Sequence, residues 1–65
     1  MYYFVVDKGS GKPVDFNFKP VAEEKKAVFH SKEDAFYFMD CNTRETAGAD
    51  KIKETRENFT ICELA

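Results

Sequence analysis

The residues of this chain that could carry out chemistry are few and lie far apart in the sequence. His30 is the only histidine, and the two cysteines are Cys41 and Cys62. A zinc site needs about three or four ligands, so these residues would require a carboxylate or a second chain to complete one. A nucleophilic cysteine needs a base within hydrogen-bonding reach, and the spacing places none near Cys41. We therefore expect a protein that is not an enzyme, with no catalytic, metal-binding or cofactor-binding residues.

The glycine-rich stretch at residues 9–12, Gly-Ser-Gly-Lys, shares its last residues with a phosphate-binding loop. The full pattern requires a glycine where Val6 stands and a serine or threonine where Pro13 stands. It also requires a helix after the loop, whose first amides would hold the phosphates. The residues after Pro13 instead alternate between apolar and polar types, which is typical of a strand. We interpret the stretch as a turn between strands.

The composition is typical of a small globular protein. Hydrophobic residues make up 43% of the chain and aromatic residues 15%, which argues against disorder although 34% of the residues are charged. We expect one compact domain that covers residues 1–65. The formal charge of −2 opposes binding to nucleic-acid phosphates, because no segment is strongly basic. A sheet that binds nucleic acid through Tyr3 is therefore the least favoured interpretation.

The first residues, MYYFVVD, resemble neither a signal peptide nor a membrane anchor. They lack a basic stretch and a cleavage site with small residues. No part of the chain reaches the ~18 consecutive apolar residues that a membrane span requires. We expect a cytoplasmic protein in which Cys41 and Cys62 are reduced thiols.

Three stretches have the composition of strands that are buried on at least one side. Residues 2–6 form a continuous run of aromatic and β-branched side chains, which indicates a strand covered on both faces. Residues 27–30 form a short strand after a charged turn. Residues 59–64 form the last strand of the chain.

The stretch at residues 14–19 alternates between apolar and polar side chains without interruption. This period of two is the pattern of a strand with one face in the core. We expect Val14, Phe16 and Phe18 to point toward the core.

One helix is clearly marked. Ser31 is a suitable N-cap residue, and Asp34 lies at the capping-box position three residues later. We predict a helix from Lys32 to about Thr46, which Gly48 can terminate. Residues 50–58 stay open between an edge strand around Ile52 and a short turn of helix.

These elements predict an α+β fold in the order β-β-β-α-β, with an antiparallel or mixed sheet and one helix packed on one face. A second interpretation extends the helix over residues 22–46, because no glycine or proline falls between Val21 and Ala47. The cap at Ser31 and the strand-forming types of Val28 and Phe29 favour the first.

Three aromatic residues follow one another in the expected helix, Phe36-Tyr37-Phe38. A helix turns by ~100° per residue, so three consecutive rings cannot all face the same core. One arc of ~160° holds the side chains that we expect to be buried, namely Ala35, Phe36, Phe38, Met39 and Thr43. Tyr37 is the ring left outside.

Tyr37 is expected to share the outer side of the helix with three charged residues, Glu33, Asp40 and Arg44. Asp40 and Arg44 stand at i, i+4 and would form a weak surface ion pair. Exposed tyrosines often serve as anchors in protein interfaces, so we take these four residues as a candidate partner-binding site. The alternative is that Tyr37 only covers its neighbours.

The expected helix covers one face of the sheet and leaves the other open. Either Tyr3 and Val5, or else the alternating set Tyr2, Phe4 and Val6, would then lie on the open face. We take Tyr3 and Val5 as a possible homodimer face, because an exposed apolar strand favours association.

In size and layout the expected fold is similar to phage-encoded inhibitors of host enzymes and to small accessory proteins of mobile elements. This similarity implies a non-enzymatic module that binds a larger host protein and modulates or inhibits it. A homodimeric accessory protein of unknown process is the alternative.

Overall fold

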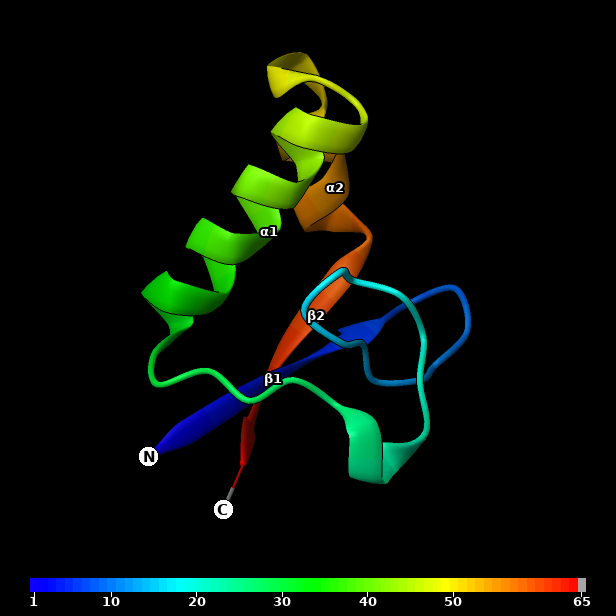
Figure 1. Ribbon diagram of the computed structural model, residues 1–65, viewed down its shortest axis with the longest axis vertical. Helices are drawn as coiled ribbons and strands as arrows, with labels where there is room; N and C mark the ends of the chain where they lie inside the picture. Colours follow the sequence, from blue (N-terminus) through cyan, green and yellow to red (C-terminus); the bar gives the residue numbers. More distant parts are fainter. Residues whose placement is uncertain (65) are drawn as a thin grey trace.

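Two strands from opposite ends of the chain form the sheet (Figure 1). Strand β1 spans Tyr2–Asp7 and strand β2 spans Phe59–Leu64, and they run antiparallel with Tyr2 opposite Leu64. Both were predicted. The computed structural model describes residues 1–64, so Ala65, the last residue of the expected domain, lies outside the described residues.

The side chains of β1 show which face of the sheet is covered. Val5 is fully buried and belongs to the core together with Ala35 and Met39 of the long helix. Tyr3 has the same parity as Val5 and is half-buried. The prediction of an open dimer face at Tyr3 and Val5 is therefore wrong. The open face carries the alternative set, Tyr2, Phe4 and Val6.

Residues 14–19 do not form the expected strand but a tight turn. The carboxylate of Asp15 accepts hydrogen bonds from the amides of Asn17 (2.9 Å) and Lys19 (3.1 Å). Phe18 has a φ of 59°. Asp side chains compete with strand pairing in this way, and the prolines on both sides of the segment lack the N–H that a ladder needs. Phe18 is buried as expected, but Phe16 is 57% exposed.

The expected strand at residues 27–30 reduces to a single bridge. The amide of Phe29 donates to the carbonyl of Tyr3 (2.8 Å), and the amide of Tyr3 donates to the carbonyl of Phe29 (2.9 Å). Ser31, two residues later, is already the N-cap of the long helix, so the pairing between Tyr3 and Phe29 cannot extend into a strand. The order β-β-β-α-β is therefore wrong, and the fold is a two-stranded antiparallel sheet with two helices.

Helix α1 spans Lys32–Thr46 and confirms the predicted bounds. The hydroxyl of Ser31 accepts a hydrogen bond from the amide of Asp34 at 3.0 Å, which is the N-cap interaction. At the other end the amides of Ala47 and Gly48 both donate to the carbonyl of Thr43. Gly48 has a φ of 103°, which favours glycine. The single long helix over residues 22–46 is excluded.

Residues that the sequence left open form short helical segments. Helix α2 spans Ile52–Glu57 and follows the 3-10 turn η2 at Ala49–Lys51, so the segment is helical and not an edge strand. A second 3-10 turn, η1, spans Glu23–Lys25. None of the helices within residues 1–64 is long and apolar enough to cross a membrane.

The buried side of α1 is narrower than expected. Ala35, Met39 and Thr43 recur every fourth residue and are buried, and the Thr43 hydroxyl donates to the carbonyl of Met39 at 2.9 Å. Phe36 is half-buried, whereas Phe38 is 44% exposed. A sheet of two strands offers too little width to cover the whole expected arc.

We expect Met39→Ala to lower the free energy of unfolding by about 3 kcal/mol, because it leaves a cavity in the centre of the core. Urea unfolding followed by circular dichroism measures this. Tyr37→Ala on the exposed side of the same helix is the matched control and should change the value by about 0.5 kcal/mol or less. Equal losses for both variants would contradict the assignment of the buried side.

Candidate protein-binding surface

Three large aromatic side chains lie together on the surface, Phe16, Tyr37 and Phe38; we call them the aromatic patch. The ring of Phe38 lies 5.7 Å from that of Tyr37 and 6.1 Å from that of Phe16. Both Phe16 and Phe38 also contact the buried ring of Phe29, at 5.4 and 5.7 Å. The patch is thus one continuous surface with a buried ring beneath it.

Two separate elements position the patch. Helix α1 carries Tyr37 on the side opposite Met39 and Phe38 on the flank that packs against Phe29. The turn at residues 14–19 turns Phe16 outward, because the turn places Phe18 rather than Phe16 in the core. Tyr37 is 64% exposed, so the sequence correctly placed this ring outside. Phe16 and Phe38 were missed, since an alternating strand and a wide helical arc would both have buried them.

Of the four predicted partner-binding residues, one is turned away from the patch. Glu33 and Arg44 lie exposed on the side of α1 that carries Tyr37. Asp40 instead faces α2, where its carboxylate accepts hydrogen bonds from Arg56 Nε (3.0 Å) and Nη2 (2.6 Å). The predicted pair between Asp40 and Arg44 is therefore wrong. Arg56 lies 16 residues after Asp40 in the sequence, so the spacing of residues along one helix could not predict this pair.

The guanidinium of Arg56 joins the two helices by a second contact. It lies 4.4 Å from the centre of the Phe36 ring, in the geometry of a cation–π interaction. The hydrogen bonds to Asp40 raise the pKa of Arg56 above its ordinary value, so the guanidinium keeps its charge. The pair fixes α2 against the flank of α1 that does not carry the patch.

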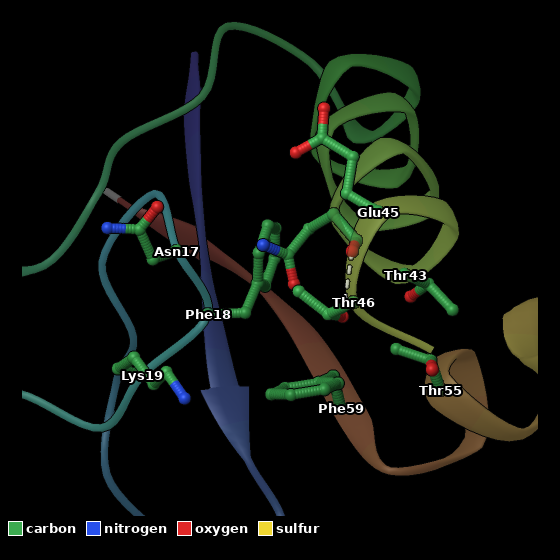
Figure 2. A pocket seen from close by; sticks show the side chains of 9 residues that line it. Asn17, Phe18, Lys19, Thr43, Glu45, Thr46, Thr55 and Phe59 are labelled. Atoms are coloured by element: carbon green, nitrogen blue, oxygen red, sulfur yellow. Dashed lines mark hydrogen bonds between the residues drawn. The ribbon is translucent and has the colours of Figure 1, made fainter. Parts of the chain in front are cut away.

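A groove of about 470 Å³ continues the aromatic patch along α1. Asn17 follows Phe16 in the turn, and Asn42 lies one helical turn after Phe38. Figure 2 shows Asn17 from the turn and Glu45 from α1 on the two walls, with Phe18 and Phe59 between them. The lining residues are Asn17, Phe18, Lys19, Asn42, Thr43, Glu45, Thr46, Thr55 and Phe59.

The chemical groups of the groove are suited to hydrogen bonding. Its walls offer two amides, three hydroxyls, one carboxylate and one ammonium, and its floor is aromatic. Within residues 1–64 no three His, Cys, Asp or Glu side chains gather closely enough to hold a metal ion. His30 lies against the ring of Tyr2. Cys41 and Cys62 are half-buried thiols without a disulfide.

The glycine-rich stretch after β1 is a turn, as predicted. The carboxylate of Asp7 accepts a hydrogen bond from the amide of Ser10 at 3.2 Å. The hydroxyl of Ser10 and nearby amides lower the pKa of Asp7, because they stabilise its charged form. Gly11 takes a φ of 72°, and Pro13 then returns beside Val6. No helix follows that could hold a phosphate.

Acidic residues surround the aromatic patch on α1. Glu33 and Asp34 lie one turn before Tyr37 and Phe38, and Glu45 lies two turns after Phe38; all three are exposed. We call them the acidic rim. Arg44 is the basic residue on this side of the helix, so this side of α1 carries an excess of negative charge.

The comparison with known proteins found no match among protein-family models, curated proteins or solved structures. No relative therefore supplies a function for the patch or the groove. The similarity in layout to phage and mobile-element proteins depended on the β-β-β-α-β order, which the structure does not have. The function has to be inferred from the surface itself.

We expect Arg56→Ala to lower the melting temperature, because it removes both the ion pair with Asp40 and the contact with Phe36. A double-mutant cycle with Asp40→Ala should give a favourable coupling that weakens as salt is added. Arg44→Ala is the matched control and should leave the melting temperature nearly unchanged. Additive effects of Arg56→Ala and Asp40→Ala would show that the pair does not hold α2 in place.

Proposed function

We propose that this chain is a non-enzymatic protein–protein interaction module that docks on a larger protein through the aromatic patch and modulates or inhibits it. The observation that carries the proposal is the exposure of Phe16, Tyr37 and Phe38 side by side. A chain of this length has few large apolar side chains with which to build a core, yet these three neighbouring rings face solvent. Contiguous exposed aromatic surface is typical of binding sites, and tyrosine is enriched at interface anchors.

The arrangement of the patch supports this role further. Phe29 lies beneath Phe16 and Phe38 and limits the directions in which their rings can turn. Side chains that are already ordered lose less conformational entropy when a partner binds. The adjoining groove offers Asn17, Asn42 and Glu45 as polar partners at the edge of an apolar centre, which is the usual anatomy of an interface.

The charge of the surface indicates the chemistry of the partner. The acidic rim would meet basic residues, while the rings of Phe16 and Phe38 would contact an apolar side chain of the partner. Rim charges of this kind mainly steer the encounter of the two proteins. The same charges repel phosphates, which disfavours the alternative of nucleic-acid binding. We therefore assign the docking site to a basic surface with an apolar centre on the partner.

We expect Tyr37→Ala to weaken binding to the partner by about 1 kcal/mol or more, because it removes the most exposed anchor. The partner is first identified by affinity purification from the source cell with the wild-type chain as bait. Isothermal titration with the purified partner then measures each variant. Lys53→Ala, on the exposed side of α2, is the control and should bind as the wild type does. Unchanged affinity of both Tyr37→Ala and Phe38→Ala would contradict the proposed site.

Reversing the charge of the acidic rim tests the partner's chemistry. We expect Glu33→Lys and Glu45→Lys to slow association at low salt, because the partner surface is basic. At high salt the rates of variants and wild type should converge. Glu57→Lys carries the same change of net charge at a position outside the rim. If it slows association equally in stopped-flow measurements, net charge rather than the rim governs the encounter.

A further inference from the structure

The outer edge of β2 is a second unpartnered feature, separate from the aromatic patch. On β1, the backbone groups of Tyr3, Val5 and Asp7 point away from β2, because they bond to Phe29, Val14 and Lys12. In an antiparallel pair, residues alternate between hydrogen-bonded and non-hydrogen-bonded positions. The bonds between the strands therefore come from the pairs Tyr2–Leu64, Phe4–Cys62 and Val6–Thr60.

The remaining residues of β2 then direct their amides and carbonyls outward. These are Phe59, Ile61 and Glu63, each with one donor and one acceptor. Within residues 1–64 none of these groups takes part in a backbone hydrogen bond to a turn, loop or cap. Proteins commonly protect such an edge with a lysine, a proline or a bulge. Strand β2 contains no lysine or proline, its register with β1 is continuous, and Glu63 is the charged side chain along it.

We propose that a second copy of this chain occupies the edge, with the two β2 strands antiparallel about a twofold axis at Ile61. Ile61 then faces Ile61 of the second copy, and Phe59 faces its Glu63. Each outward donor meets an outward acceptor, so all three residues of both copies are paired. The two sheets become one sheet of four strands.

The number of paired residues, together with charge, selects this register among the symmetric ones. An axis at Glu63 would place the two Glu63 carboxylates opposite each other, which is unfavourable, and would leave Phe59 unpaired. Axes at Cys62 or Thr60 also bring outward groups together, but they leave Phe59 or Glu63, respectively, without an outward partner in the β2 strand of the second copy. The axis at Ile61 keeps the carboxylates apart and joins two half-buried isoleucines into one apolar contact on the core side of the sheet.

The proposed dimer does not depend on the docking function of the aromatic patch, but it determines how two patches are placed relative to each other. A twofold axis between antiparallel neighbours is perpendicular to the sheet, so both α1 helices lie on the same side of it. The dimer therefore offers two aromatic patches on one face. A partner with two matching sites would bind with increased avidity.

Cross-linking tests the register directly. In a Cys41→Ser background, Thr60→Cys places a new thiol opposite Cys62 of the second copy at a non-hydrogen-bonded pair. The Cα atoms of such pairs are ~4.5 Å apart, within the range that a disulfide spans. We expect oxidised glutathione to convert this variant to a covalent dimer on a non-reducing gel. Cys41→Ser alone and Cys41→Ser with Glu63→Cys are the controls and should cross-link little. Equal cross-linking of all three, or of none, overturns the register.

Sedimentation tests the association itself. Wild type and Glu63→Ala should sediment with the mass of two subunits at micromolar concentration. Glu63→Pro removes one outward N–H without removing a bond to β1, and it should shift the mass to one subunit with an unchanged circular dichroism spectrum. If this variant unfolds, the cross-linking experiment alone decides whether the two β2 strands pair. A one-subunit mass for the wild type overturns the proposal. A one-subunit mass for Tyr37→Ala also overturns it, because association would then occur through the patch.

Discussion

Strand β1 is hydrogen-bonded along both of its edges, and the rest of the molecule takes its position from this strand. One edge pairs with β2 along its length. The other edge receives Lys12 and Val14 from one segment of the chain and Phe29 from another. Buried backbone N–H and C=O groups need hydrogen-bond partners. These short contacts supply the partners on the edge of β1 where no further strand is formed. Val5 lies at the centre of this strand, so the core collects around it.

The arrangement explains how a sheet of only two strands can support a fold. The segments beside the edge of β1 that faces away from β2 bring Val14, Ala27 and Phe29 into the core, although none of these segments is itself a regular strand. Helix α1 closes the core from above with Ala35 and Met39. The layer formed by the two strands and these segments is narrow, so it covers only the stripe of α1 that carries Ala35, Met39 and Thr43. The rings on either side of that stripe stay partly in solvent, and this is the physical origin of the aromatic patch.

The sequence was sufficient for elements whose signals are local. The Ser31 cap, the apolar run of β1 and the last strand each depend on neighbouring residues, and each was predicted, although β1 extends one residue further than predicted, to Asp7. The stretch at residues 14–19 shows where this reasoning fails. Its alternation is that of a strand, but the carboxylate of Asp15 accepts hydrogen bonds from the amides of Asn17 and Lys19, so the segment forms a turn instead. Periodicity shows which side chains are apolar, but it does not show that a side chain can replace strand pairing as the partner of the backbone amides.

The candidate site was predicted in part for the same reason. Helical spacing placed Tyr37 and Glu33 correctly on the outer side of α1. It could not show that Phe16 reaches the same surface from a different segment, or that Arg56 draws Asp40 away from it. Both facts depend on contacts between residues that are distant in the sequence. A surface assembled from two elements becomes visible only once the fold is known.

The pairing of the first strand with the last also has a consequence during synthesis. The ribosome releases residues 2–7 long before residues 59–64 exist, so β1 emerges without the neighbour that its backbone requires. Helix α1 depends on local contacts and can form earlier, whereas the sheet must wait. Folds with many such distant contacts form more slowly than helical ones. In the nascent chain, the aromatic and β-branched residues of β1 would be exposed during this interval, and chaperones that bind extended apolar segments would meet them first.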